Sequence, residues 1–388
     1  MKIAYIVPRF YPFKGGGEQN IFALASRMAS NGHDVTIITT NIRFKKNEPL
    51  ASYEMYKGMK VIRHWALDDQ LYAGFYPSLL PYLLFNKFNI IHTSGIGFFW
   101  REICLIIKKI ISPHTIFITT PHGPFMALGD KSGIRGFIKK YYTLVLKRLL
   151  PWLYNLIIEV NSKQNIWMTK EYNIPKNKIL LIPNGIDKSY IETSIVEHSI
   201  KERIILTYMN RLEYYKGVQD VLKALFVMKS KRMEIPFFYI MGRPWGYSDT
   251  IYKMVSDLNL KDDIKFILYP SDEERDNIFY YKSQVNILPS KWEGTGITLI
   301  EAMAKGNVII TTTGNEASDI LITENVNGFV YNFEDVDALV KILHNLLTNQ
   351  DLIKLIRKNN IKKANKFTWE NIFPLYEKSL IKLINNII

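Results

Sequence analysis

The chain has 388 residues, of which 47% are hydrophobic and 22% are charged, which is typical of a soluble globular protein with two or three domains. Its single cysteine, Cys104, excludes a disulfide framework and a cysteine-based metal cluster. The formal net charge is +14, and the excess lies in residues 1–185, which contain 24 Lys and Arg against 10 Asp and Glu. Such a field favours anionic partners such as phosphates or an acidic lipid surface.

The chain begins directly with a strand-like segment, and no uninterrupted apolar run reaches the length of a membrane span. We therefore expect a cytoplasmic protein without a signal peptide. In the first half, short β-branched runs alternate with helical segments. The predicted strands are 2–7, 34–40, 60–63, 89–93, 115–119, 155–160 and 179–182. The predicted helices are 18–30, 97–110, 134–150 and 162–171.

The second half repeats this rhythm after a polar segment without clear periodicity, 187–203, which we predict to be the linker. Its predicted strands are 204–209, 237–241, 264–267, 285–288 and 308–312. Alternating strands and helices predict an α/β protein with parallel sheets and helices on both faces. Two doubly wound domains in series, divided after residue 186, would bind a ligand at the carboxyl ends of their strands, in the crevice between them.

The most informative motif follows the predicted strand 285–288 and reads PSKWEGTGITLIEAMA. Glu293 and Glu301 stand eight positions apart, with Gly294 and Gly296 between them at the start of a helical run. Free backbone N–H groups at a helix start bind anions, and glycine lets a phosphate or a sugar approach closely. The motif therefore suits a sugar nucleotide, although Glu301 also fits a helix-capping carboxylate.

Three other loops at predicted strand ends carry candidate residues. Gly15, Gly16 and Gly17 precede a helix and form a weak anion-site signal that differs from a dinucleotide fingerprint. Arg211 and Lys216 lie five residues apart before another helix, where they can clamp a diphosphate or remain solvated charges. His122, in Thr-Pro-His-Gly, can contact a substrate oxygen, or it is a loop histidine bonded to backbone.

The predicted helix 134–150 is basic and apolar at once. Its cations are Arg135, Lys139, Lys140, Lys147 and Arg148, and they lie among Phe137, Tyr141, Leu144 and Val145. The helix is either a solvated face or a surface that docks on a membrane or an anionic acceptor. We expect no nucleic-acid binding, because no recognised binding motif accompanies the charge.

Together these features resemble the family 4 retaining glycosyltransferases of GT-B fold, over nearly the whole chain. The resemblance is carried by GGGE at 15–18, GHDV at 32–35, TPHG at 120–123, NS at 161–162, IPNGID at 182–187, Arg211-x4-Lys216-Gly217 and Glu293-x7-Glu301-Ala-Met-Ala. It implies two Rossmann-like domains that face each other across a cleft: an acceptor-side domain at 1–186 and a nucleotide-sugar domain at 187–366. Residues 367–388 would form a helix returning to the first domain.

The resemblance also implies residue roles. Arg211 and Lys216 would grip the donor diphosphate, Glu301 would bond the ribose hydroxyls, and Glu293 would meet the transferred sugar. Backbone groups around Gly294, Gly296 and Ile297 complete this pocket, to which the loop at Gly242 also belongs. From the first domain, Gly16 and Gly17 would approach the diphosphate and His122 the sugar. The expected reaction is metal-independent transfer of a hexosyl group from a nucleoside diphosphate sugar, with the donor phosphate taking the acceptor proton.

The sequence departs from the family pattern at Asn210, where glycine is usual, at Leu268, and in the Gly242–Gly246 loop. These positions leave the nucleotide base open. The expected acceptor is a glycan or a lipid-linked saccharide, in the synthesis of cell-surface polysaccharide, glycolipid or glycoprotein glycans, with the protein peripheral on the inner face of the cell membrane. Two alternatives stay open: an epimerase or phosphorylase of GT-B fold, or a non-catalytic subunit that binds an acceptor.

Overall fold

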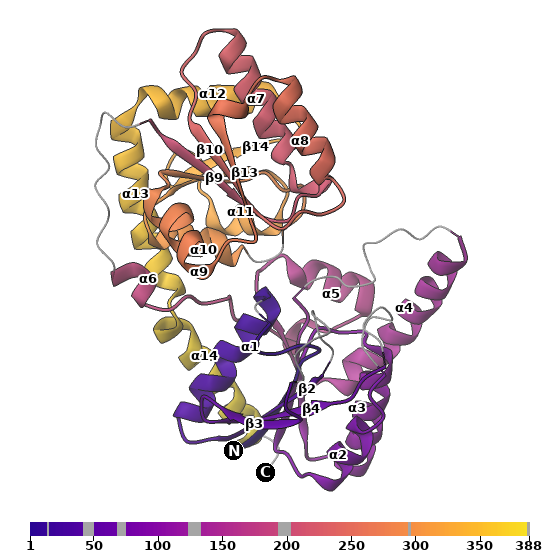
Figure 1. Cartoon of the computed structure of the whole chain (residues 1–388). Coiled ribbons are helices and arrows are strands. Elements are labelled where there is room, and N and C mark those ends of the chain that lie inside the picture. Colours follow the sequence, from indigo (N-terminus) through magenta and orange to yellow (C-terminus); the bar gives the residue numbers. More distant parts are fainter. Residues whose placement is uncertain are drawn as a thin grey trace. The chain divides into compact units, whose positions relative to one another are not determined.

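The computed structural model describes residues 1–13, 15–41, 50–67, 75–122, 133–192, 203–293 and 296–385 (Figure 1). The chain divides into two compact units. Unit 1 comprises Met1–Asn184 together with Glu370–Ile388, and unit 2 comprises Gly185–Trp369. Each unit is a sheet between helices, as the alternation of strands and helices predicts; the sheet is parallel in unit 2 and parallel except for the β3–β4 pair in unit 1.

Unit 1 contains, among the described residues, an eight-stranded sheet in the order β3-β4-β2-β1-β5-β6-β7-β8. The strands are β1 (Lys2–Ile6), β2 (Asp34–Thr40), β3 (Tyr53–Tyr56), β4 (Met59–His64), β5 (Ile90–Ser94), β6 (Ile116–Thr120), β7 (Leu156–Glu159) and β8 (Ile179–Leu181). The seven strands predicted in this half are confirmed. The sequence analysis missed β3, a largely exposed edge strand that pairs antiparallel with β4. Lys57 and Gly58 join the two strands with positive φ angles, the backbone that a two-residue hairpin turn requires.

Helices cover both faces of this sheet. α1 (Gly16–Ser30) and α14 (Trp369–Asn385) lie on one face, and α2 (Leu79–Phe85), α3 (Phe99–Ile111) and α4 (Gly133–Leu153) lie on the other (Figure 1). α5 (Gln164–Tyr172) packs against α4. Successive side chains of β1 point to opposite faces of the sheet. Ala4 and Ile6 belong to the core cluster of α2, α3 and α4, whereas the Tyr5 hydroxyl contacts Tyr376 of α14.

A buried polar chain ties α14 to the sheet. The hydroxyl of Tyr376 lies 2.9 Å from that of Tyr5 and 2.8 Å from Nδ1 of His92. Nε2 of His92 lies 2.8 Å from Oγ1 of Thr120. All four side chains are buried, and burial lowers the pKa of His92 to about 3. The C-terminal helix is therefore part of the core of unit 1.

Unit 2 contains, within its described residues, a six-stranded sheet whose pairings are all parallel, in the order β11-β10-β9-β12-β13-β14. The strands are β9 (Ile205–Met209), β10 (Phe237–Gly242), β11 (Ile264–Leu268), β12 (Val285–Leu288), β13 (Val308–Thr312) and β14 (Gly328–Tyr331). The five strands predicted here are confirmed, and β14 was missed. The strand order reverses between β9 and β12, so their carboxyl ends flank the switch point at which open α/β sheets bind ligands.

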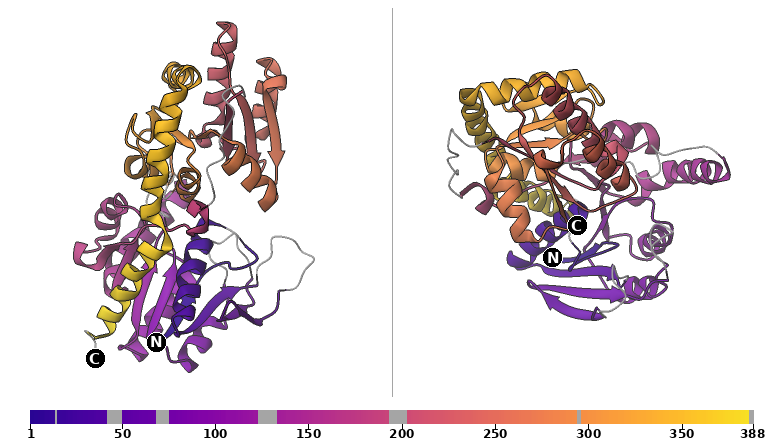
Figure 2. Two further views of the ribbon diagram at one scale, coloured as in Figure 1. Left: turned by 90° about the vertical axis from the view of Figure 1, so that its left-hand side faces the viewer. Right: turned by 45° about the horizontal axis from the view of Figure 1, so that its top comes forward.

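The helices of unit 2 again lie on both sides of the sheet (Figure 2). They are α6 (Ser189–Glu192), α7 (Val218–Ser230), α8 (Ser248–Asp257), α9 (Asp272–Arg275), the π-helix η4 (Asp276–Lys282), α10 (Ile297–Ala304), α11 (Glu316–Leu321), α12 (Val336–Thr348) and α13 (Gln350–Ala364). α6 stands inside the predicted linker, of which residues 193–202 lie outside the described residues.

The two chain segments that enter and leave unit 2 are paired with each other. Ile186 bridges Thr368: its N–H donates to the carbonyl of Phe367 at 2.9 Å, and its own carbonyl accepts the N–H of Trp369 at 3.0 Å. A Cβ on Gly185 would lie 2.5 Å from the Trp369 ring, so only glycine fits beneath it. The segment that enters unit 2 and the segment that leaves it therefore lie side by side.

Candidate functional site

Two loops meet at the switch point of unit 2: residues 210–217 after β9 and residues 289–293 after β12. Gly217 has a φ of 76°, and a Cβ there would lie 1.9 Å from the carbonyl oxygen of Pro289. The N–H of Lys291 donates to the carbonyl of Tyr215 at 2.8 Å. The glycine thus lets the loops touch, and this contact places Lys216 beside Glu293.

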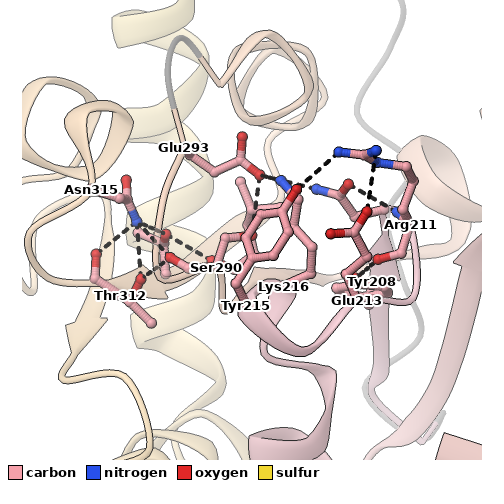
Figure 3. A network of polar contacts seen from close by, with 12 residues as sticks. Tyr208, Arg211, Glu213, Tyr215, Lys216, Ser290, Glu293, Thr312 and Asn315 are labelled. Atoms are coloured by element: carbon pink, nitrogen blue, oxygen red, sulfur yellow. Dashed lines mark hydrogen bonds and ion pairs between the residues drawn. The ribbon is translucent and has the colours of Figure 1, made fainter. Parts of the chain in front are cut away.

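Glu293 is the centre of a polar network in which three donors reach one carboxylate oxygen, Oε1. Nζ of Lys216 lies at 2.5 Å, Nδ2 of Asn210 at 3.0 Å and Oγ of Ser290 at 3.1 Å (Figure 3). Lys216 is only 7% exposed, and a buried cation requires such a counter-charge. The predicted diphosphate ligand Lys216 and the predicted sugar ligand Glu293 are therefore an ion pair in this structure.

Arg211 lies in the same loop but makes other contacts. Its Nη2 donates to the Tyr215 hydroxyl at 2.9 Å, its Nη1 lies 3.2 Å from Oε1 of Glu213, and its guanidinium lies over the Trp245 ring. Its side chain is 45% exposed. Lys216 and Arg211 thus both lie at the switch point, the first buried and the second exposed, and each has a carboxylate partner.

Glu301 lies in α10 and is half-buried against the π-helix η4. The hydroxyl of Tyr280 donates to its Oε2, and the Tyr190 side chain of α6 also donates to it. Burial raises the pKa of Glu301 above its ordinary value. Of the backbone candidates, Gly296 caps α10 with a φ of 57°, Ile297 is the first residue of that helix, and Gly294 lies outside the described residues.

Gly242 ends β10 beside the same loop. Its φ is 137°, and a Cβ there would lie 2.2 Å from the carbonyl oxygen of Asn210. This glycine brings the end of β10 against the first residue after β9, so its observed role is backbone packing next to the network.

The first-unit candidates gather at the ends of β5 and β6. A Cβ on Gly17, in the first turn of α1, would lie 3.3 Å from Cδ2 of His122 and 3.7 Å from Oγ of Ser94, and Gly16 begins this helix. His122 has a φ of 60° and is half-buried, and desolvation lowers its pKa to about 4. Among the described residues, its Nε2 has no hydrogen-bond partner. The structure therefore brings Gly17 and a neutral His122 together.

Sequence reasoning missed Asn210, Ser290 and Tyr280 as members of these networks. Asn210 could have been singled out from the sequence, because it stands where the family pattern has glycine, directly before Arg211. Ser290 lies in the motif of Glu293 but was not singled out. Its carbonyl accepts bonds from Oγ1 of Thr312, at 2.5 Å, and from Nδ2 of Asn315, at 3.4 Å (Figure 3). Tyr280 belongs to a π-helix 21 residues from Glu301, which no local pattern in the sequence indicates.

Comparisons with known proteins agree with this architecture. The family model "Glycosyltransferase Family 4" matches residues 14–190, and "Glycosyl transferases group 1" matches residues 191–366. The GDP-mannose:cellobiosyl-diphosphopolyprenol alpha-mannosyltransferase of Xanthomonas campestris is 23% identical, over 87% of this chain and 85% of its own. The UDP-Gal:alpha-D-GlcNAc-diphosphoundecaprenol alpha-1,3-galactosyltransferase of Escherichia coli is 25% identical, over 82% of each chain.

Two solved structures have the same fold. The sucrose-phosphate synthase of Thermosynechococcus elongatus superposes with a TM-score of 0.77 at 16% identity, over 100% of both chains. HepE of Anabaena, solved with UDP and glucose, gives a TM-score of 0.75 at 15% identity, over 98% of this chain and 100% of its own. The two family models, the two Rossmann-like units and these likenesses establish that the chain belongs to the family 4 glycosyltransferases of GT-B fold.

Proposed function

We propose that the protein transfers a hexosyl group from a nucleoside diphosphate sugar to a lipid-linked or other glycan acceptor, with retention at the anomeric carbon, in the synthesis of a cell-surface glycan. The observation that carries this proposal is the buried contact between Lys216 and Glu293 at the switch point of unit 2. A site that keeps a buried cation against a carboxylate is prepared for a ligand that offers both a phosphate and hydroxyl groups.

In this proposal a donor diphosphate binds Lys216 and Arg211, and the free hydroxyls of its sugar bind Glu293. The backbone N–H groups at the start of α10, at Gly296 and Ile297, add hydrogen bonds, and Glu301 accepts from the ribose. These groups neutralise the charge that develops on the departing diphosphate, so the reaction requires no divalent metal. Full activity in the presence of EDTA is the expected result, and restoration of lost activity by Mg²⁺ or Mn²⁺ would contradict it.

In unit 1, we propose that Gly16 and Gly17 admit the diphosphate and that His122 contacts the sugar near the reacting carbon. The support is the solvent-shielded Nε2 of a half-buried, neutral imidazole beside Gly17; this nitrogen has no hydrogen-bond partner among the described residues. A neutral imidazole donates or accepts one hydrogen bond at this nitrogen without adding charge next to the anomeric centre.

The acceptor proposal rests on the relatives and on the charge of the first half. Both relatives described above are named for acceptors on a polyprenyl diphosphate. Residues 1–185 carry the whole positive excess of the chain, which suits an acceptor with a diphosphate headgroup. We therefore propose a saccharide on a polyprenyl diphosphate as the first acceptor class to test.

A matching experiment begins with a thermal-shift screen of UDP, GDP and ADP hexoses. The donor that raises the melting temperature is then incubated with a GlcNAc-diphosphoundecaprenol acceptor and, separately, with free oligosaccharides. Transfer with an α-linkage from an α-linked donor, shown by NMR of the product, supports the proposal. An inverted linkage would overturn retention, and release of the nucleotide without any need for an acceptor would favour an epimerase or phosphorylase.

We also propose that α4 docks on an anionic membrane surface. Its buried side carries Leu146, Leu150 and Leu153, yet Tyr141, Leu144, Val145 and Trp152 on the same helix are exposed. Arg148 shares a surface pocket with these four exposed side chains, and α4 contains no Asp or Glu. Apolar side chains next to cations suit the headgroup region of a bilayer. In the part of the chain that the structure describes, no helix is long and apolar enough to span a membrane.

Vesicle co-sedimentation tests this surface. We expect binding to vesicles that contain phosphatidylglycerol at low salt, and weaker binding at high salt, because salt screens the attraction. Trp152→Ala together with Arg148→Ala should reduce binding several-fold, whereas Lys231→Ala with Arg232→Ala, two exposed cations of unit 2, should not. Equal binding of the two double variants would contradict the assignment to α4.

A further inference from the structure

Asn210 is the first residue after β9, and its side-chain amide makes two oriented hydrogen bonds. Its Nδ2 donates to Oε1 of Glu293 at 3.0 Å, and its Oδ1 accepts the backbone N–H of Arg211 at 2.9 Å. Only the oxygen of the amide can accept from an N–H group, so the second bond determines which end of the amide faces Glu293. The amide consequently presents its donor to the carboxylate.

The backbone of Asn210 is fixed as well. Its N–H donates to the carbonyl of Met241 at 3.1 Å, and its own carbonyl lies so close to Gly242 that a Cβ there would come within 2.2 Å. The side chain therefore starts from a position set by two neighbouring strands, β9 and β10. The bond from the N–H of Arg211 holds the side chain as well, so the hydrogen bond to Glu293 costs little further side-chain freedom.

Oε1 of Glu293 receives Lys216, Asn210 and Ser290, although one carboxylate oxygen has two lone pairs. Figure 3 shows these contacts ending on one oxygen while the other oxygen points away from them. A donor diphosphate competes for the Lys216 ammonium, because its two ionised phosphates together carry more charge than one carboxylate. The neutral amide of Asn210 has no comparable attraction to the phosphate and is already held by the N–H of Arg211.

From this geometry we infer that Asn210 is a positioning residue: it keeps Glu293 directed at the donor sugar when Lys216 turns to the diphosphate. The inference rests on the proposed function of the same site. It follows that Asn210 acts mainly on recognition of the sugar: its Nδ2 bonds the Glu293 carboxylate, whereas its Oδ1 bonds only the backbone N–H of Arg211 and not the guanidinium that would bind the diphosphate.

Calorimetric affinities of the full-length protein for a nucleotide sugar and for its parent nucleoside diphosphate test this inference. The probes are UDP-glucose with UDP and GDP-mannose with GDP. Asn210→Ala should weaken binding of the nucleotide sugar about 10-fold, the typical value of a hydrogen bond to a charged group, and should change nucleoside diphosphate binding less than about twofold. Asn210→Asp has the same shape but places a second carboxylate beside Glu293, so its loss should be larger.

A double-mutant cycle separates positioning from a general structural defect. In a Glu293→Gln background, Asn210→Ala should change the affinity for the nucleotide sugar by less than about twofold, because its target carboxylate is already gone. An equal loss of affinity for both ligands, no loss for either, or additive effects in the cycle would overturn the role of Asn210. A wild-type protein that binds neither nucleoside diphosphate would instead overturn the proposed function, and the inference with it.

Discussion

The charged side chains of unit 2 that are predicted to bind the donor already contact other side chains of the protein. Lys216 contacts Glu293, Arg211 contacts Glu213 and Tyr215, and Glu301 accepts from Tyr280. Breaking a buried ion pair without replacing it is costly, so a ligand must supply a phosphate and hydroxyl groups together. A nucleoside diphosphate sugar does this, whereas inorganic phosphate alone would leave Glu293 without its cation.

Replacing Lys216 tests its place in the site. Lys216→Ala should lower turnover roughly 10²- to 10³-fold, since a preorganised charge partner of the transition state contributes about 3–4 kcal/mol. Lys253→Ala, which removes an exposed cation of α8, should leave turnover unchanged. Steady-state kinetics of both variants measure the difference, and near-normal turnover of Lys216→Ala would remove this residue from the donor site.

His92 predicts a pH dependence of stability in unit 1. Burial holds its folded-state pKa near 3, below the unfolded value of 6.5, so the unfolded chain takes up the proton first as the pH falls. The stability that neutral His92 contributes is fully present above pH 6.5 and decreases as the pH falls from there toward 3. At pH 5 the free energy of unfolding is lower by about 2 kcal/mol. His122, with a pKa of about 4, acts in the same direction.

Urea unfolding at pH 7 and pH 5 checks this expectation. His92→Gln cannot titrate, so it should lose about 2 kcal/mol less than the wild type over that interval. His114→Gln, which replaces an exposed histidine, should lose as much as the wild type. If both variants show the same loss, His92 does not titrate on unfolding as its burial implies.

Much of the candidate donor site could be predicted at residue scale because its residues belong to short motifs. Lys216 and Glu293 stand at fixed offsets from glycines, and the glycines have positions that only glycine fits. Their pairing could not be predicted, since an ion pair across 77 residues depends on the reversal of strand order between β9 and β12. The contact of Tyr280 with Glu301 could not be predicted either, because it joins two elements on either side of β12 and because a π-helix has no clear periodic signal.

At the scale of elements, the contact of the two switch-point loops depends on the turn between η2 (Tyr214–Lys216) and α7. Gly217 caps α7 with a positive φ and lies against the carbonyl of Pro289. A larger residue would have to move one loop away from the other. Because Lys216 and Glu293 lie on opposite loops, that movement would also separate their charges.

Gly217→Ala should therefore destabilise unit 2 by more than about 2 kcal/mol, from left-handed backbone strain of about 1–2 kcal/mol plus the clash with Pro289. Two control variants separate the backbone strain from the clash. Gly314 has a φ of 76° and open space around it, so Gly314→Ala should show the strain alone. Gly246 has open space and no positive φ, so Gly246→Ala should be nearly neutral. Equal denaturant midpoints for the three variants would contradict this account.

The elements themselves were largely predictable, since twelve strands with buried β-branched residues were placed from periodicity. The strands that were missed, β3 and β14, show what periodicity lacks. β3 is a four-residue edge strand whose side chains alternate between exposed and half-buried, so no apolar run marks it. β14 is equally short and begins with Gly328, a residue that weakens strand patterns.

At the scale of the whole molecule, unit 1 is assembled from both ends of the chain. α14 buries Ile372, Phe373, Tyr376 and Leu380, and Tyr376 supplies the hydroxyl that bonds Tyr5 and His92. Each such apolar side chain contributes about 1.5–3 kcal/mol, so their sum is comparable with the whole stability of a domain, about 5–15 kcal/mol.

A chain that ends at Trp369 should therefore lose the folded state of unit 1 and keep that of unit 2. Limited proteolysis followed by mass spectrometry should show protection confined to residues 203–369. Ile381→Ala, which trims an exposed residue of α14, should remain protected throughout. Protection of unit 1 in the truncated chain would show that α14 is dispensable for its core.

The position of Tyr376 has a consequence for synthesis. Tyr5 leaves the ribosome before the whole of unit 2, and its hydroxyl partner follows 371 residues later. The nascent first unit must wait, with His92 lacking one of its partners, while all of unit 2 is translated and folds ahead of it. The core of unit 1 thus closes only after α14 has been synthesised, and a chain that stops before α14 leaves that core open.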